Sequence, residues 1–288
     1  MRINQGFSLV HVWGVLSRIP KTRNPWGYLG FAALLFLVIW VWTIQIDRSL
    51  GISAFASGWI LFGILAFLSL FSARKRLPFL PLASSSRWFH LHAVGGFLAL
   101  FLFWLHTGGM WSQGLYGQIL TALFYITSIS GVGGLVIEKI YPRQLTYSGI
   151  EIIYERIPGE IAEIREEVES HVLKCTEETG SSTLAEHYLE TLSWYFQRPR
   201  FFMNNIFGSH LSQHWVRQQC MILERYLDKN ERKYLDGIYV LAEKKRKIDF
   251  HYALQTLLKT WLLVHIPLAA AVMAMVFWHL ILIQVFFV

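Results

Sequence analysis

The chain has 288 residues, of which 54% are hydrophobic and only 16% are charged, and this balance argues against an ordinary soluble globular protein. Of its 19 acidic residues, 18 lie between Glu138 and Asp249, so the composition predicts a membrane protein with one polar insert. The net charge of +7 comes from basic residues that lie largely beside long apolar runs, where they set topology, and this argues against a nucleic-acid partner.

Five apolar runs are long enough to cross a hydrocarbon layer of roughly 30 Å, which requires about 20 helical residues. The third and fourth come from one uncharged stretch that is too long for a single helix and is broken at Gly108, Gly109 and Gly114. The five runs cover residues 24–46, 49–73, about 88–107, about 115–137 and 260–288. Membrane lipid is therefore the expected surrounding of most of the chain.

The predicted fold is all-α, with a helical insert between spans four and five. The expected parts are an N-terminal cytoplasmic or interfacial segment at 1–25, spans one to four within 26–137, a soluble insert at 138–255 and span five within 256–288. In the insert, Ile157, Ile161, Ile164, Val168 and Val172 recur at steps of three and four between glutamates, which predicts an amphipathic helix with a solvated acidic face. A last insert helix at about 229–250 is expected to lead into span five, and the only two cysteines, Cys175 and Cys220, are expected to be reduced thiols.

Basic residues predict the direction of insertion, because short cytoplasmic loops carry an excess of Lys and Arg. They gather before span one, between spans two and three, and at both ends of the insert, whereas the other loops carry only Arg48. The N-terminus and the insert are thus expected in the cytoplasm and the C-terminus outside, in a cell inner membrane. No cleaved secretory signal is recognised at the N-terminus, and an organellar membrane stays an alternative.

Four histidines lie deep within these spans, where an ionisable residue is costly and its default interpretation is functional. His92 and His106 lie on span three, and His265 and His279 lie on span five. Each pair is separated by 14 residues, which is about 21 Å along a helix and returns to within roughly 40° of the same face. Each helix therefore presents two imidazoles on one seam.

The depths of the histidines match between the two helices, which are predicted to be parallel. His92 follows Arg87 by five residues, and His265 follows Lys259 by six. His92 should therefore face His265 near the inside, and His106 should face His279 near the outside. Two imidazoles at one level can supply both axial ligands of a haem iron, so the sequence predicts two haem b groups stacked across the bilayer.

Several neighbours of these histidines have two interpretations. Arg87 and Lys259, with Lys75 and Arg76, could neutralise haem propionates or act only as topology signals. Trp104, Trp261 and Trp278 could pack on the macrocycles or form an aromatic belt, and the glycines at 131, 133 and 134 are expected to serve close helix packing. His90 lies off the seam and is expected near the interface rather than on iron.

The pattern His-x13-His on two parallel helices resembles the cytochrome b subunit of respiratory bc complexes. Its placement on spans three and five resembles the ferric reductase-like transmembrane domain, and the stretch 257–261 with His265, Pro267 and His279 is similar to bacterial membrane cytochromes b. The resemblance is confined to spans three and five and implies that the four histidines are axial ligands. The Pro-Glu-Trp-Tyr motif of quinol-oxidising cytochrome b is absent, and a flavin and nicotinamide domain of its own is not expected.

The sequence thus predicts a dihaem subunit of a redox complex that conducts electrons across the membrane. It would exchange them with a quinone and/or partner subunits such as iron–sulfur, flavin or c-type cytochrome proteins, as part of an oxidoreductase if it takes part in catalysis. Two rivals remain at this stage. One is a metal-ion transporter that uses the same histidines around a single ion, and the other is a non-redox scaffold whose insert recruits a soluble partner.

Overall fold

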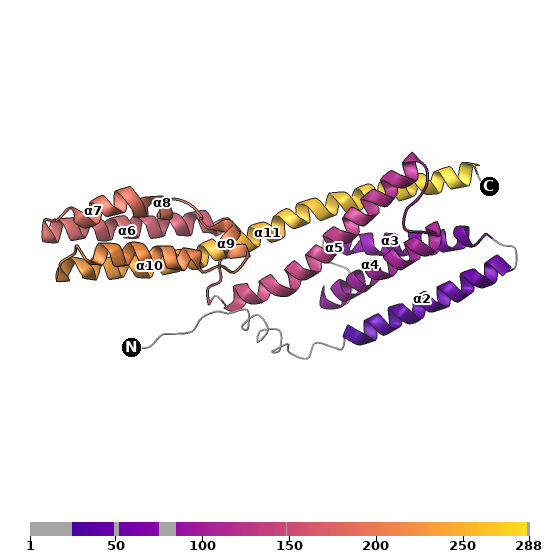
Figure 1. Cartoon of the computed structure of the whole chain (residues 1–288), viewed down its shortest axis with the longest axis horizontal. Helices are drawn as coiled ribbons and strands as arrows, with labels where there is room; N and C mark the ends of the chain where they lie inside the picture. Colours follow the sequence, from indigo (N-terminus) through magenta and orange to yellow (C-terminus); the bar gives the residue numbers. More distant parts are fainter. Residues whose placement is uncertain (1–24, 49–51, 75–84, 148, 287–288) are drawn as a thin grey trace. The chain divides into compact units, whose positions relative to one another are not determined.

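The computed structural model describes residues 25–48, 52–74, 85–147 and 149–286. Within these ranges the chain is all-α, as predicted (Figure 1). The interfacial segment predicted at 1–25 lies outside the described residues except for Pro25, with which the first described helix begins.

Five described helices are long and apolar enough to cross a membrane, which gives as many candidate spans as predicted. They are α2 (Pro25–Arg48), α3 (Ser53–Arg74), α4 (Ser85–Thr107), α5 (Leu115–Tyr147) and α11 (Lys229–Phe286). The break between α4 and α5 falls where the glycines predicted it, because Gly108 and Gly114 adopt positive φ values of 65° and 77° that other residues rarely take.

The chain divides into two compact units, one of residues 1–132 and 265–288 and the other of residues 133–264. In the first unit α2, α3 and α4 pack against one another (Figure 1). Its core is apolar and includes Leu61, Leu102, Phe103, Phe124 and Val272. Large side chains such as Phe31 and Ile129 point outward, as expected of helices that face lipid.

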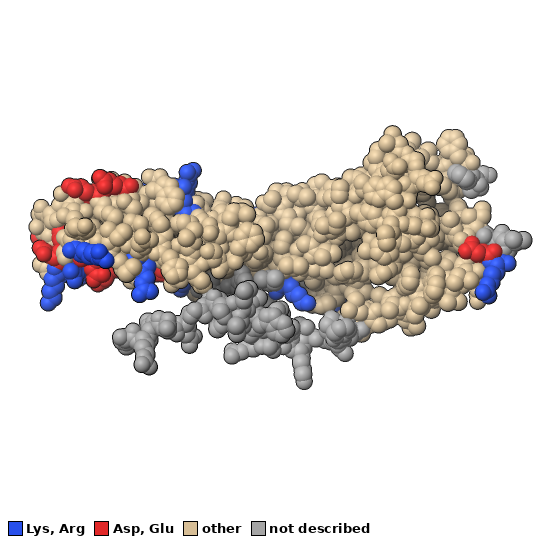
Figure 2. Space-filling view, in the orientation of Figure 1, with Lys and Arg blue, Asp and Glu red and all other residues tan. Residues whose placement is uncertain are grey.

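The second unit contains the helical insert that was predicted between spans four and five. After a 3₁₀ turn at Tyr154–Arg156 it contains α6 (Ile157–Thr179), α7 (Thr183–His187), a π-helical turn η2 (Tyr188–Leu192), α8 (Ser193–Phe196), α9 (Phe202–Ile206) and α10 (Leu211–Glu224). The five predicted aliphatic residues of α6 are buried, and Gly180 ends this helix in the left-handed conformation. On the face drawn in Figure 2, most charged side chains gather over the insert.

Helix α11 is longer than predicted. The helix expected at about 229–250 and span five are one continuous helix of 58 residues, with Pro267 inside it. The predicted helix therefore leads into span five as expected, and no glycine or proline interrupts the helical pattern between Gly237 and Pro267. Helices in membranes tolerate such a proline, since neighbouring groups can satisfy the backbone carbonyl that it leaves unpaired.

A buried ion pair lies inside the insert and was not predicted. Lys245 Nζ donates to both carboxylate oxygens of Asp249 at 2.8 and 2.6 Å, and neither side chain is exposed. The ammonium group also lies 4.1 Å from the ring centroid of Tyr195. Burial raises the pKa of Asp249 to about 6 and lowers that of Lys245, while the attraction within the pair opposes both shifts.

The two cysteines and the acidic face of α6 in the insert agree with the predictions made for them. Cys175 and Cys220 are free and buried, and burial raises the pKa of Cys220 to about 11, so it is a protonated thiol at neutral pH. Six glutamates of α6 are exposed, namely Glu163, Glu166, Glu167, Glu169, Glu177 and Glu178. The solvated acidic face is therefore confirmed for α6, and Asp249 and Glu231 are buried exceptions elsewhere.

Candidate functional site

The structure brings the four histidines of spans three and five together in the two pairs that their spacing predicted. The ring centroids of His92 and His265, the inner pair, are 6.5 Å apart with an interplanar angle of 81°. Those of His106 and His279, the outer pair, are 6.3 Å apart at 86°. All four side chains are half-buried. Helix α4 supplies one member of each pair and α11 supplies the other.

The seam residues between the two pairs are buried on both helices. On α4 the seam residues Ala99 and Phe103 are 1% and 6% exposed, and on α11 Val272 is 4% exposed. The close backbone contacts of α4 are with α2 and α3 rather than with α11. The 14-residue spacing then repeats the same geometry at two levels.

The outer pair is oriented by groups from α3 and α5. His106 Nδ1 lies 2.9 Å from the Ala54 carbonyl, which can only accept, so Nδ1 carries the proton and the lone pair is on Nε2. Tyr116 stacks on His279 with ring centroids 6.2 Å apart, and its hydroxyl donates to the Met275 carbonyl. Hydrogen bonds of this kind typically fix the orientation of histidines that bind metals.

The inner pair has a different environment. Ser130 Oγ of α5 lies 3.2 Å from His265 Nδ1, and the ring of Phe71 stacks on His92 at 4.9 Å. His92 Nδ1 is buried and makes no hydrogen bond of good geometry, although the Leu68 carbonyl is close enough to act on it electrostatically. His106 and His265 are thus oriented by hydrogen bonds. The ring of Phe71 on α3 packs on His92, and the ring of Tyr116 on α5 packs on His279.

A large apolar cavity lies beside the outer pair. It has a volume of about 940 Å³ and both His106 and His279 line it. Its walls are formed mainly by aliphatic and aromatic side chains, among them Leu61, Phe62, Phe103, Phe124 and Val276. Cavities of this size and lining are typical of sites for drug-sized ligands and cofactors.

The distances within both pairs fit one iron bound between two imidazoles. Such imidazoles have ring centroids about 6.4 Å apart, because each metal–nitrogen bond is about 2.0 Å and each nitrogen lies about 1.2 Å from its ring centroid. The measured 6.3 and 6.5 Å are close to this value. The outer pair also has the apolar cavity that a macrocycle needs, so the residues present fit a haem.

The two cations predicted to neutralise propionates, Arg87 and Lys259, belong to different units of the chain. Lys259 belongs to the second unit, where it donates to Glu155 at 2.6 Å and lies 3.8 Å from the ring centroid of Tyr154. Arg87 is exposed in the first turn of α4. Lys75 and Arg76 lie outside the described residues. The structure therefore gives Lys259 a protein partner, which sequence reasoning missed.

The remaining aromatic and imidazole candidates lie away from the seam or pack within the helices. His90 stacks on Tyr28 and its Nδ1 lies 2.6 Å from the Ser86 carbonyl, and the indole of Trp104 donates to Tyr125. Trp278 is 54% exposed, as a belt residue would be. Trp261 lies so close to Gly134 that a Cβ there would be 2.0 Å away, which supports the predicted packing role of that glycine.

Comparisons with protein families, with curated proteins and with solved structures found no match for this chain. Within the described ranges there is also no group of three or more His, Cys, Asp or Glu that could hold a metal ion. The fold and site thus define a helical protein with five candidate membrane spans and two separate histidine pairs.

Proposed function

We propose that this protein conducts electrons across a membrane through two b-type haems, each bound by one histidine of α4 and one of α11. The observation that carries the proposal is the pairing itself: two imidazole pairs with centroid separations of 6.3 and 6.5 Å, one beside a 940 Å³ cavity. Iron between two imidazoles supplies reversible one-electron transfer.

The protein's own contribution is to orient the ligands and to exclude water. His106 donates from Nδ1 to Ala54, so Nε2 keeps a lone pair for iron. The aromatic and aliphatic walls keep the cavity apolar, and this low polarity raises the cost of a change in charge and so tunes the reduction potential.

The metal-transporter alternative is less well supported by the same geometry. Its four ligands should converge on one ion, whereas the histidines form two pairs and no larger ligand group occurs among the described residues. The scaffold alternative makes no use of either pair.

Spectroscopy of the full chain, purified after haem-replete expression, tests the proposal. We expect the reduced spectrum of bis-imidazole b-type haem with about two haems per chain. Because the two imidazole planes are near perpendicular in each pair, the oxidised protein should give strongly anisotropic low-spin electron paramagnetic resonance signals. A protein that folds but contains no haem, or that binds zinc or copper instead, would contradict the proposal.

A methyl group at Gly58 is expected to disturb the outer haem specifically. A Cβ there would lie 2.9 Å from His106 Cε1, so Gly58→Ala must displace the imidazole from the Ala54 carbonyl. We expect a shifted midpoint potential or partial loss of the outer haem in a redox titration. The matched control is Gly131→Ala, whose Cβ would lie at an ordinary 3.6 Å from His265 Cε1, and equal titrations of the two variants would contradict the prediction.

A further inference from the structure

One part of the insert lacks acidic residues altogether. All 18 acidic residues of the insert lie outside residues 191–223, whereas Arg198, Arg200 and Arg217 lie inside this stretch. Because the other parts of the insert are rich in glutamates, such a separation of charge indicates a surface that meets anionic groups.

The middle of this stretch also exposes large apolar side chains. We call residues 197–211, which connect α8 to the first residue of α10, the tip. Met203, Phe207 and Leu211 are at least half exposed, and Phe207 is 78% exposed. The Phe207 amide donates to the Met203 carbonyl at 3.1 Å, so these two side chains lie one helical turn apart on one face of α9. Exposed apolar side chains that gather beside arginines are typical of segments that lie in a membrane interface.

Two residues in the left-handed conformation fix the shape of the tip. Phe201 precedes α9 with a φ of 56°, which is rare for a residue with a side chain, and Gly208 follows α9 with a φ of 67°. The ring of Phe201 packs against Trp194 and Trp215, with ring centroids 6.1 and 6.0 Å apart. These contacts hold a backbone conformation that costs energy, so α9 is a defined bend between α8 and α10.

The tip lies at the end of the insert from which span five departs. Tyr195 of α8 donates to the Ala242 carbonyl of α11 at 3.3 Å, and the ring of Phe202 lies 6.3 Å from that of Tyr252, farther along α11 (Figure 1). Between these two contacts the chain advances ten residues along α11, which is about 15 Å toward Thr260, where the uncharged run of span five begins. Tyr252 precedes Thr260 by eight residues, or about 12 Å.

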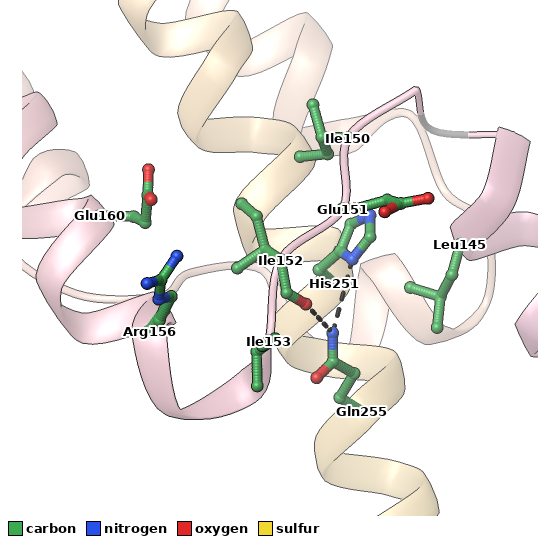
Figure 3. Close-up of a pocket in the computed structure, with 9 residues that line it drawn as sticks. All are labelled: Leu145, Ile150, Glu151, Ile152, Ile153, Arg156, Glu160, His251 and Gln255. Atoms are coloured by element: carbon green, nitrogen blue, oxygen red, sulfur yellow. Dashed lines mark hydrogen bonds between the residues drawn. The ribbon is translucent and has the colours of Figure 1, made fainter.

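Further contacts join this end of the insert to the start of the span. The ring of Tyr154 stacks on that of Tyr252 at 5.7 Å, and Lys259 Nζ, the last charge before the span, lies 3.8 Å from the Tyr154 ring centroid. Gln255 donates to a carbonyl of the same segment at 2.8 Å, which holds the exposed Ile153 at this level (Figure 3). Since the headgroup layer adds roughly 5–8 Å to each side of the hydrocarbon, the lipid surface is within reach of this end.

The carboxylates on the elements packed against the tip have cations of their own. Asp249 of α11 is paired with Lys245, and Glu155, beside Tyr154, is paired with Lys259. Arg198 is exposed on the tip itself. The tip therefore keeps a net positive charge, which attracts the anionic headgroups of a bilayer surface.

We infer that the tip docks onto the surface of the membrane that the protein's own helices span, on the side from which the insert projects. Met203, Phe207 and Leu211 lie in the headgroup layer, and Arg198 lies against anionic phospholipid. A lipid surface is the occupant because the contacts along α11 keep the tip beside the start of span five, whatever soluble proteins are present. This docking involves neither histidine pair, so it is independent of haem.

The test measures the immersion of a nitroxide attached at Met203→Cys in the full chain, reconstituted in nanodiscs of phosphatidylcholine with phosphatidylglycerol. Cys175 and Cys220 are buried, so the reagent reacts with the introduced thiol. Oxygen concentrates in lipid and a nickel chelate stays in water, and their ratio of collision with the label reports its depth. We expect a ratio at least about threefold above that of the control Val240→Cys. Val240 is 66% exposed on α11 and lies 20 residues, or about 30 Å, before the uncharged run of span five.

Two substitutions in the labelled protein separate charge from apolar contact. Arg198→Gln should lower the ratio toward the value found in pure phosphatidylcholine, whereas Arg225→Gln, an exposed residue at the other end of α10, should leave it unchanged. Phe207→Ser should lower it in both lipids, and because this side chain is largely exposed the fold should not change. Equal ratios at Met203→Cys and Val240→Cys in both lipids would overturn the inference and leave the tip to a soluble partner. An unchanged ratio in Arg198→Gln would overturn the assignment of anionic lipid.

Discussion

Replacing His106 with Ala is expected to remove the outer haem and leave the inner one, so that haem content falls from about two to about one per chain. The variant loses one of two axial ligands and the hydrogen bond from Nδ1 to Ala54, while the inner pair of His92 and His265 is untouched. Haem extraction against protein concentration measures the ratio, and a redox titration should change from two components to one.

The matched control for this variant is His90→Ala. His90 lies on the same helix but stacks on Tyr28 and its Nδ1 lies 2.6 Å from Ser86 O, so both haems should remain. His92→Ala should give the complementary result, with loss of the component that His106→Ala keeps. If His106→Ala retained both haems at wild-type content, the pairing would be wrong even though haem is present.

The pairing of the histidines was predictable because it depends only on distances along the sequence. A spacing of 14 residues places two side chains on one face of a helix, and the distance from Arg87 and Lys259 sets their depth. Both quantities are independent of how the bundle packs. The same is true of the helix ends at Gly108, Gly114 and Gly180, where local backbone chemistry decides.

The groups that orient the imidazoles were not predictable in the same way. Ala54 acts through its backbone carbonyl, and Gly58 acts by lacking a side chain, so neither carries a chemical signature. Ser130 and Tyr116 are ordinary polar residues of an apolar helix until the rotation of α5 about its axis is known. Contacts of this kind depend on three helices at once.

Lys259 shows the limit of reasoning from charge and depth. Its place just before span five was consistent with a propionate partner, but the structure pairs it with Glu155, which lies 104 residues earlier in the sequence. Both side chains are largely exposed, so solvent screens this contact and it is expected to add little to stability. The ion pair in the core of the insert is a different case.

Asp249→Ala is expected to destabilise the insert by about 3–5 kcal/mol, because it leaves the ammonium group of Lys245 buried without a partner. Replacing both residues, as in Lys245→Met with Asp249→Leu, removes both charges and should restore most of the loss. The reason is that a buried pair of ions offsets its own desolvation only when it is complete. The i,i+4 spacing on α11 was visible in the sequence, but its burial depends on packing against Tyr195.

Amide hydrogen exchange of the full chain in detergent measures this effect locally, since opening of the insert can be separated from that of the spans. Protection in the peptides around Asp249 should fall in the single variant and largely return in the double variant. Glu224→Ala is the control, because its ion pair with Arg232 is long at 3.9 Å and half-exposed, and its loss should cost under about 1 kcal/mol. Equal loss of protection in the single and double variants would show that packing rather than the unpaired charge is responsible.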